Sequence, residues 1–419
     1  MSALLGAVLA LVGAPLFVVI GALALVQFLL AEVDLTVVFI EIYRIAQTPL
    51  LAAIPLFAFA GFVLAESGAA GRLVRFSEAA LGWLPGGLAI MALSVCALFT
   101  ALTGASGMTI VALGGLLYPA MRHRRFPDGF SLGLLTTAGS LGLLFPPSLP
   151  LIVYGIVSAA PVDQLFLAGI LPGALLVGAL SLYSVCQGRR GGSTPVHGPP
   201  RLGAALRESA WELLLPVVIF AGIYGGLIAV SEAAALCALY VLFVEMVVHR
   251  EIRPAQLPKI IRDSMVLVGG IVVILAASMA YTSYLIDAQV AARLLELVQA
   301  HISSRTVFLV LLNLFLLAVG CMVDMYSALV VVVPLILPIA QAYGVHPVHL
   351  GIIVLTNLEI GYSTPPVGLN LFVASIRFDK PVLRLYRASL PFLGILLLCL
   401  VAVTYLPGLS LFLVERWGP

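Results

Sequence analysis

The chain has 419 residues, of which 62% are hydrophobic and 10% are charged, and its mean hydropathy is +1.17. A soluble protein of ordinary composition has about 25% charged residues, so these values predict an integral membrane protein. The net charge of +2 provides no basic face, and binding of nucleic acid is therefore not expected.

The sequence also excludes nucleotide and redox chemistry of the familiar kinds. It contains no G-x-G-x-x-G motif, and neither of its two lysines, Lys259 and Lys380, follows a glycine-rich loop, so no dinucleotide or Walker-type site is expected. No two cysteines have the C-x-x-C spacing, and all five lie singly in apolar runs, where they are expected to act as small buried residues: Cys96, Cys186, Cys237, Cys321 and Cys399.

The apolar runs predict the membrane helices in chain order. The first, from about residue 4 to residue 30, is long enough to span, and no basic segment of a cleavable signal peptide precedes it. We assign residues 1–48 to this helix and a connecting segment. Further apolar runs cover residues 49–65, 86–121, 129–161, 164–187, 210–249, 264–286, 306–340, 350–376 and 389–414.

Two of these runs predict re-entrant hairpins. The run at 86–121 has no charged residue and would be about 54 Å long as a straight helix, whereas the hydrocarbon core is about 30 Å thick. Its middle, Gly104–Gly107 (Gly-Ala-Ser-Gly), is a poor helix interior. Two half-helices that return to the same membrane face fit both observations. We expect the second hairpin at 306–340.

The basic residues predict the orientation, because Lys and Arg near short loops collect on the cytoplasmic side. With both hairpins, and with two crossings in 210–249, all but four basic residues fall inside: the exceptions are Arg44, Arg293, Arg305 and Arg416. The expected topology has nine full spans, a cytoplasmic N-terminus and a periplasmic C-terminus.

The two halves of the chain form an internal repeat. A shift of 219 residues places Pro119 on Pro338, Gly142 on Gly361, Pro146-Pro147 on Pro365-Pro366 and Pro172 on Pro391. The first repeat, 49–187, holds hairpin 86–121 and broken helix 129–161. The second, 264–414, holds hairpin 306–340 and broken helix 350–376, and 188–263 forms a cytoplasmic loop and two scaffold helices. In the expected topology the repeats are inverted, which is typical of secondary transporters.

Four backbone interruptions near mid-membrane predict the binding sites. They lie at 103–107, 145–148, 320–324 and 361–366. A break in lipid frees backbone groups that cost several kcal/mol unless they face protein or a wet cavity. Free carbonyls and hydroxyls suit a hard cation such as Na⁺, and half-helix N-termini suit an anion. We therefore expect two or more Na⁺ ions and no organic cofactor.

Each hairpin tip, paired with the broken helix of its own half, predicts one Na⁺ site. The first site comprises Gly104, Ser106, Phe145 and Pro146, within the break that ends at Ser148, and the second comprises Gly320, Asp324, Gly361 and Thr364. The residues expected to contact substrate are Ser106, Ser148, Asn357 and Thr364. Close packing of small residues is the alternative interpretation of Gly104 and Ser106.

No Lys or Arg lies near these breaks to neutralise an anionic substrate, and this favours cation symport. Asp324 and Glu359 are acids within the apolar runs, where a carboxylate costs about 2.5–3.5 kcal/mol. Asp324 supports either a Na⁺ site or the hairpin tip as a helix cap. Glu359 has either a functional role or an interhelical hydrogen bond. The six histidines lie at borders and in a loop, so a histidine proton relay is not expected.

Several linked motifs between about residues 49 and 400 carry a resemblance to a known family. In the first half they are Thr103–Gly114 (TGASGMTIVALG), Tyr118–Met121 and Leu144–Gly155 (LFPPSLPLIVYG). In the second half they are Gly222–Gly226, Ser231–Ala235, Pro334–Pro338 and Asn357–Phe372 (NLEIGYSTPPVGLNLF). The chain resembles the large membrane subunit of TRAP (tripartite ATP-independent periplasmic) transporters. It departs from the family at Ala229–Ser231, where members often have Thr-Pro before Glu-Ala-Ala.

The resemblance implies an all-α polytopic protein with an elevator-type ion transporter fold in the bacterial inner membrane. It implies no enzyme activity but Na⁺-coupled uptake of an organic acid, such as a C4-dicarboxylate or sialic acid. The resemblance also implies two protein partners: a small four-helix membrane subunit, here expected as a separate chain, and a periplasmic substrate-binding protein. A stand-alone Na⁺- or H⁺-coupled carboxylate carrier is the alternative. A membrane enzyme using Asp324 and Glu359 is disfavoured, because no histidine, metal motif or activated nucleophile accompanies them.

Overall fold

The fold is that of a computed structural model, which describes residues 8–9, 12–82, 86–190 and 202–418. In these ranges all regular structure is helical. By length and composition seven helices qualify as membrane spans, or up to eight when the bent pair Asp128–Leu144 and Leu149–Ser158 is one span. An all-α polytopic membrane protein is therefore confirmed. The count of nine spans stays a prediction, since several apolar helices of 10–17 residues also occur.

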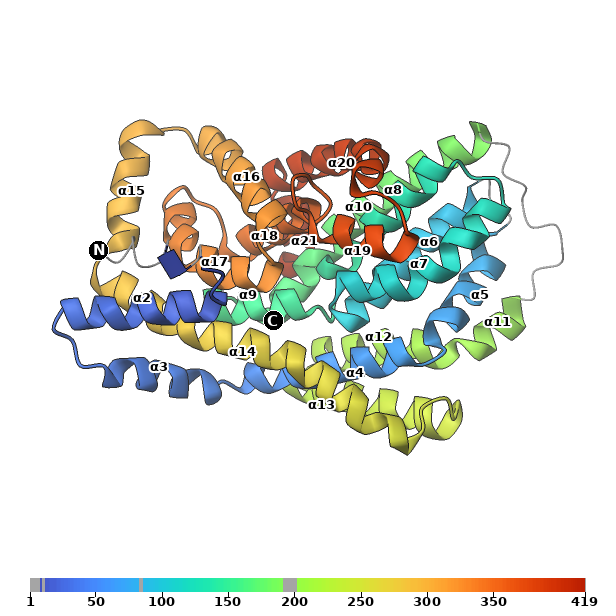
Figure 1. The fold of residues 1–419 in the computed structure, drawn as a ribbon, viewed down its shortest axis with the longest axis horizontal. Coiled ribbons are helices and arrows are strands. Elements are labelled where there is room, and N and C mark those ends of the chain that lie inside the picture. The colour runs from blue at the N-terminus through green and yellow to red at the C-terminus, as the bar shows by residue number, and fades with distance from the viewer. Residues whose placement is uncertain (1–7, 10–11, 83–85, 191–201, 419) are drawn as a thin grey trace.

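Six helices pack side by side in what we call the scaffold layer, along the lower edge of the molecule in Figure 1. The first residues of the expected N-terminal helix and most of the loop at 188–200 lie outside the described ranges. The scaffold layer consists of α2 (Leu16–Leu30), α3 (Thr36–Ala46), α4 (Ala53–Glu66), α12 (Ala210–Tyr224), α13 (Val230–Phe243) and α14 (Leu257–Asp287).

The remaining long helices form a second layer, the core layer, which contains most of the buried apolar side chains. In the first half it holds α6 (Gly87–Thr103), α7 (Ser106–His123), α8 (Asp128–Ala138), the short helix η2 (Leu141–Leu144), α9 (Leu149–Ser158) and α10 (Val162–Arg190). In the second half it holds α16 (Arg305–Met322), α17 (Met325–Ala342), α18 (Pro347–Gly361), α19 (Leu369–Phe378), α20 (Val382–Tyr405) and α21 (Gly408–Trp417).

Two shorter helices connect the layers at opposite ends of the molecule. Figure 1 shows α5 (Ala69–Leu81) between α4 and α6 on the right, and α15 (Val290–His301) between α14 and α16 on the left. Each half therefore has the same succession: a scaffold helix, a connector, a helix pair, a broken helix and a long final helix. Ser106 begins α7 and Met325 begins α17, which are 219 positions apart.

The backbone breaks predicted at four places are confirmed. Gly104, with φ of +67°, ends α6 in the left-handed conformation that glycine adopts without strain. Val323 and Asp324 are extended between α16 and α17. The two Pro-Pro motifs separate η2 from α9 and α18 from α19, because proline can neither donate the helical hydrogen bond nor fit behind the preceding turn. Re-entrance of the hairpins stays a prediction, since α16 and α17 are each 18 residues long and pass the span criteria separately.

Glycines bring each broken helix into backbone contact with the first helix of its own hairpin. A Cβ on Gly361 would lie 2.5 Å from the carbonyl carbon of Gly320, and a Cβ on Gly142 would lie 2.1 Å from the carbonyl oxygen of Ala97. Gly320 and Gly361, both predicted as Na⁺-site residues, thus meet across the α16–α18 contact. At the equivalent contact, Gly142 lies against Ala101.

The close contact between Gly320 and Gly361 predicts that one added methyl group destabilises the protein. Gly361→Ala is expected to lower the stability of the purified protein by about 1–3 kcal/mol, because the added carbon must push two backbones apart. Thermal unfolding in detergent measures the change. Gly394→Ala in α20 is the control, since a Cβ there meets no atom within 4 Å. Equal unfolding midpoints for Gly361→Ala and the wild type would contradict the close approach.

Candidate functional site

A cavity of about 220 Å³ lies where the two hairpin tips meet. It is lined by residues of both breaks and of the first turns of α7 and α17, together with parts of the two broken helices and of α14. The lining residues are Gly104, Ala105, Ser106, Gly107, Leu143, Pro150, Leu267, Asp324, Met325, Tyr326, Tyr362 and Leu369. Gly104, Ser106 and Asp324, which the sequence assigns to two separate sites, therefore share one cavity.

Hydrogen bonds tie the tips to one another and to the second break. The hydroxyl of Tyr326 donates to the carbonyl oxygen of Gly104 at 2.9 Å, across 222 residues of sequence. The backbone N–H of Met325 donates to the hydroxyl of Tyr362 at 2.5 Å. Consequently the first residues of α7 and α17 both lie at the cavity wall, where helix N-termini give a partial positive charge.

Asp324 caps the second hairpin helix. Its carboxylate oxygen Oδ1 accepts a hydrogen bond from the backbone N–H of Ser327 at 3.0 Å. The capping role considered from the sequence is therefore present. The same residue also lines the cavity.

The hydroxyls of the two broken helices are oriented by their own backbones. Ser148 donates to the carbonyl oxygen of Leu143 at 2.5 Å, and Thr364 donates to that of Ile360 at 2.8 Å. Each hydroxyl proton is thereby directed at the preceding half-helix, which leaves the oxygen lone pairs for another partner. Neither side chain is among those that line the cavity.

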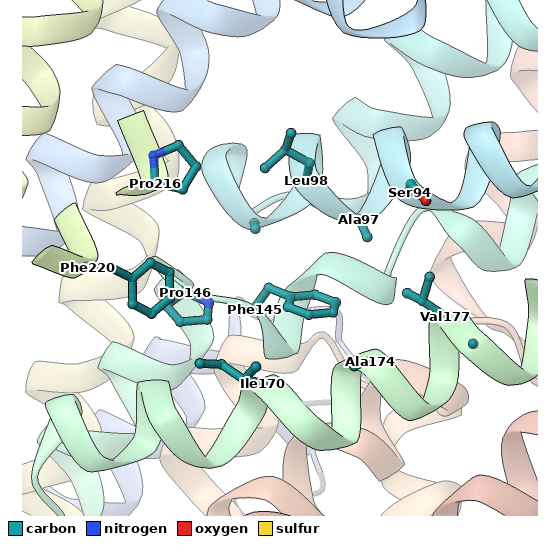
Figure 2. A pocket seen from close by; sticks show the side chains of 12 residues that line it. Ser94, Ala97, Leu98, Phe145, Pro146, Ile170, Ala174, Val177, Pro216 and Phe220 are labelled. Atoms are coloured by element: carbon teal, nitrogen blue, oxygen red, sulfur yellow. The ribbon is translucent and has the colours of Figure 1, made fainter. Parts of the chain in front are cut away.

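Phe145 and Pro146 lie in the predicted break but do not line the hairpin-tip cavity. They line an apolar pocket of about 710 Å³, together with α6, α10 and, from the scaffold layer, Pro216 and Phe220 of α12 (Figure 2). Their side chains face away from the hairpin-tip cavity, whose lining they do not join. A Na⁺-site role for these two residues would have to come from their backbone carbonyls.

Four buried polar atoms near the breaks have no hydrogen-bond partner, and the sequence analysis did not single out their residues. They are Thr103 Oγ1, Ser363 Oγ, Asn370 Oδ1 and Asn370 Nδ2. Only their positions in the sequence could have indicated these residues, because Thr103 precedes Gly104, and Ser363 and Asn370 flank the Pro365-Pro366 motif. Buried oxygens without partners fit an oxygen-coordinated cation such as Na⁺.

Asn357 and Glu359 lie in α18, away from the cavity. Asn357 donates to Asn313 Oδ1 of α16 at 2.7 Å, and Asn313 donates to Thr404 Oγ1 of α20 at 3.1 Å. Asn357 is thus an interhelical hydrogen-bonding residue, and its substrate contact stays a prediction without support from this position. Glu359 is fully buried, and within the described ranges neither carboxylate oxygen has a hydrogen-bond partner.

The tips of two helix pairs meet at one cavity, broken helices pack against them, and a separate scaffold layer lies alongside. This arrangement is typical of the membrane part of a secondary transporter. The sequence matches the family described as "Tripartite ATP-independent periplasmic transporter, DctM component" over residues 3–409. The chain therefore belongs to this family and is a large membrane subunit of a TRAP transporter.

Individual relatives agree with this assignment. The chain is 37% identical to the C4-dicarboxylate TRAP transporter large permease protein DctM of Pseudomonas aeruginosa, over 90% of this chain and 89% of that one. It is 32% identical to the sialic acid TRAP transporter large permease protein SiaM of Vibrio cholerae, over 87% of this chain and 86% of that one.

A solved structure has a similar fold. The crystal structure of the Alcanivorax borkumensis YdaH transporter superposes with a TM-score of 0.60 and 15% identity, over 87% of this chain and 88% of that one. At this identity the likeness shows the fold alone.

The cap at Asp324 predicts different results for two substitutions. Asp324→Asn is expected to leave thermal stability close to that of the wild type, because Asn caps as well as Asp. Asp324→Ala is expected to cost about 0.5–2 kcal/mol. Thermal unfolding of both variants measures the difference. If Asn is as damaging as Ala, the negative charge and not the cap is what the tip needs.

Proposed function

We propose that this large permease imports an organic acid by Na⁺ symport, as part of a tripartite system. The observation that carries the proposal is the cavity at the hairpin tips. Two helix N-termini reach it from opposite halves of the chain, and neither Lys nor Arg is among the residues that line it. An anion there would be stabilised by backbone N–H groups and by co-bound cations.

The partial positive charge of the helix N-termini and the names of two relatives support an organic acid as the substrate. A carboxylate suits helix N-termini, and the two relatives carry names for C4-dicarboxylate and sialic acid transport. The volume of about 220 Å³ accommodates a small organic acid. Three side chains that line the cavity carry a hydroxyl, and those of Tyr326 and Tyr362 already bond to the backbone of the hairpin tips. The hydroxyl of Ser106 is therefore the expected hydrogen-bond donor to the carboxylate.

Sodium ions would bind behind the cavity, where each hairpin meets its own broken helix. In the first half Thr103, Gly104, Ser106 and Ser148 supply hydroxyl and carbonyl oxygens, and in the second half Gly320, Asp324, Gly361, Ser363 and Thr364 do so. Bound Na⁺ would supply the positive charge that the side chains around the cavity lack. Two or more ions are proposed, because the two halves repeat the same break.

An elevator motion is the proposed mechanism, in which the core layer slides against the scaffold layer. The two layers are joined through the connectors α5 and α15 at opposite ends (Figure 1). The pocket between α12 and the core layer is lined largely by apolar side chains (Figure 2). Surfaces of this kind slide without breaking directional hydrogen bonds.

The proposed partners are a periplasmic substrate-binding protein and a separate small four-helix membrane subunit in the bacterial inner membrane. The family description, a tripartite periplasmic transporter, supports both. A cytoplasmic N-terminus and a periplasmic C-terminus follow from the distribution of Lys and Arg. The second candidate function is a stand-alone carboxylate carrier.

Reconstituted uptake tests the proposal. Proteoliposomes that contain this chain and the small subunit are given the binding protein and a radiolabelled C4-dicarboxylate or sialic acid. Uptake is expected only with all three proteins and an inward Na⁺ gradient. Uptake by this chain alone would favour the stand-alone carrier, and uptake driven by a proton gradient alone would exclude Na⁺ symport.

Substitutions in the same assay test the ion sites. Thr364→Ala is expected to weaken the Na⁺ dependence of uptake by at least tenfold, since a lost ligand costs about 1.4 kcal/mol or more. Thr136→Ala is the matched control, because Thr136 makes the same bond to the fourth preceding carbonyl, Leu132, but lies away from the breaks. An unchanged Na⁺ dependence in Thr364→Ala would remove this residue from the site.

A further inference from the structure

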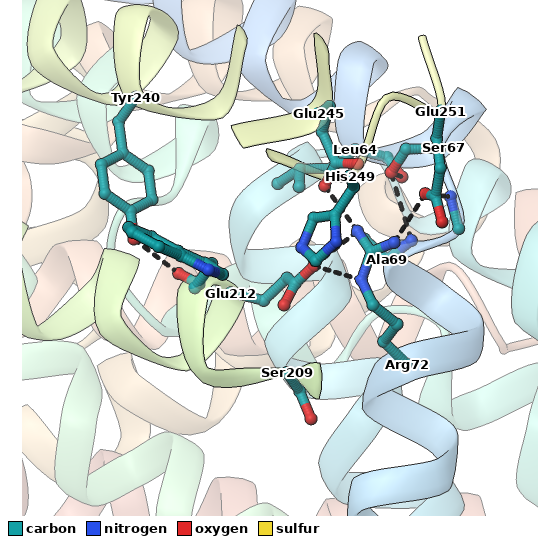
Figure 3. A network of polar contacts seen from close by, with 12 residues as sticks. Leu64, Ser67, Ala69, Arg72, Ser209, Glu212, Tyr240, Glu245, His249 and Glu251 are labelled. Carbon is teal, nitrogen blue, oxygen red and sulfur yellow. Dashed lines mark hydrogen bonds and ion pairs between the residues drawn. The ribbon is translucent and has the colours of Figure 1, made fainter. Parts of the chain in front are cut away.

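A buried cluster of charged residues lies where the connector α5 joins the scaffold layer. Arg72 of α5 extends toward Glu212 of α12, Glu245 of the π-helical turn Val244–Val248 that follows α13, and Glu251, with His249 beside them (Figure 3). Arg72, Glu212 and Glu245 are 4%, 2% and 0% exposed. The cluster is separate from the hairpin-tip cavity and takes no part in the proposed transport chemistry.

One guanidinium serves three carboxylates. Arg72 Nε donates to Glu212 Oε1 at 2.6 Å, Nη2 donates to Glu245 Oε1 at 2.7 Å, and Nη1 donates to Glu251 Oε2 at 2.6 Å. Glu251 also accepts from the backbone N–H of Gly68 at 2.7 Å. These bonds hold the first turn of α5 against two scaffold helices.

The charges of the cluster do not balance. Burial acts to raise the pKa of Glu251, but the bonds from Arg72 and Gly68 outweigh it and lower that pKa, so Glu251 is ionised. Its side chain is 39% exposed, and water shares its charge. The single positive charge of Arg72 can therefore neutralise at most one of the two buried carboxylates, Glu212 and Glu245. A second buried negative charge without a partner costs several kcal/mol.

In the described ranges no other cationic side chain makes a hydrogen bond to the pair. His249 Nε2 lies 3.6 Å from Glu212 Oε1, which is within ion-pair range but beyond hydrogen-bond distance, and its side chain is 17% exposed, so water would share the charge of a protonated His249. The Tyr240 hydroxyl of α13 donates to the carbonyl oxygen of Trp211. Arg75, one turn along α5, pairs with Glu208 at the surface.

The free oxygens of the two carboxyl groups adjoin a very small cavity. Glu212 Oε2 and Glu245 Oε2 are buried and have no hydrogen-bond partner among the residues that the structure describes. Both residues line a cavity of about 10 Å³, with Leu64, Trp211, Leu215, Tyr240, Val241 and Val244. That volume is near the minimum for one water molecule. No group of three His, Cys, Asp or Glu in the described ranges has the arrangement of a metal site.

We propose that Glu212 and Glu245 form a proton-binding site, in which the pair shares one proton at neutral pH. With the proton bound, Arg72 faces one carboxylate of the pair and that of Glu251, and the carboxyl group of the pair adjoins the small cavity. Release of the proton leaves two buried negative charges against one guanidinium and weakens the attachment of α5. This proposal does not depend on the transported substrate.

Thermal unfolding of the full chain in detergent between about pH 6 and about pH 9 tests the site. An unfolded glutamate loses its proton near pH 4.3, whereas the folded pair keeps one to higher pH. The folded state then binds more protons, and stability falls as the pH rises. The wild-type unfolding midpoint is expected to fall by about 2–4 °C more than that of Glu245→Gln over this range, because the amide imitates the protonated acid and does not titrate.

Glu208→Gln is the matched control. It removes an exposed carboxylate from the pair with Arg75 at the same connector helix, and its pH slope is expected to equal that of the wild type. Glu212→Gln is also expected to flatten the pH slope, since it removes the second buried carboxylate beside Arg72. If both buried variants keep the wild-type slope, or lose stability equally at every pH, both carboxylates are ionised and the proposal is wrong.

If a variant does not fold, infrared difference spectra of the wild type test the same proposal. One carboxylic acid C=O band is expected to disappear between about pH 6 and about pH 9 as the pair ionises. The same spectra are then recorded for the Glu359→Gln variant. This variant lacks the other buried glutamate side chain of the described residues, so its band cannot be confused with that of the pair. If no carboxylic acid band disappears over this pH range in the Glu359→Gln variant, the proposal is wrong.

Discussion

The structure depends on a constraint that the bilayer sets: every backbone group freed by a helix break must find a partner in the protein or face a wet cavity. The four breaks described above meet this constraint with partners from the same half of the chain and from the opposite half. The Tyr326 hydroxyl satisfies the carbonyl of Gly104, and the Tyr362 hydroxyl satisfies the N–H of Met325. The cavity, the helix N-termini at its wall and the tip-to-tip contact all follow from this requirement.

The positions of the breaks could be predicted from the sequence, because they are local. Glycine at 104 and the two Pro-Pro motifs disrupt a helix wherever they occur, and the 219-residue shift relates the halves. The assembly of the breaks could not be predicted in the same way. Two symmetric sites were expected, one in each half, whereas Ser106 and Asp324 share a single cavity. That meeting depends on how the halves pack, which no local pattern encodes.

Side-chain direction was the other limit. Phe145 lies at the predicted break, but its ring faces the apolar pocket beside α12. Asn357 lies in the recognised motif, but it bonds to Asn313 of a neighbouring helix. The Arg72 cluster was missed because its members come from residues 72, 212, 245 and 251, and each resembles an ordinary interfacial charge. Only the fold shows that three carboxylates converge on one guanidinium.

The contact between Gly320 and Gly361 also bears on how the duplicated halves diverged. At the equivalent place in the first half, Gly142 again has no side chain, yet the facing residue is Ala101. One partner of the pair has therefore accepted a methyl group, while the partner on the broken helix is glycine in both copies. The two copies therefore differ on the hairpin side of this contact, whereas on the side of the broken helix both lack a side chain.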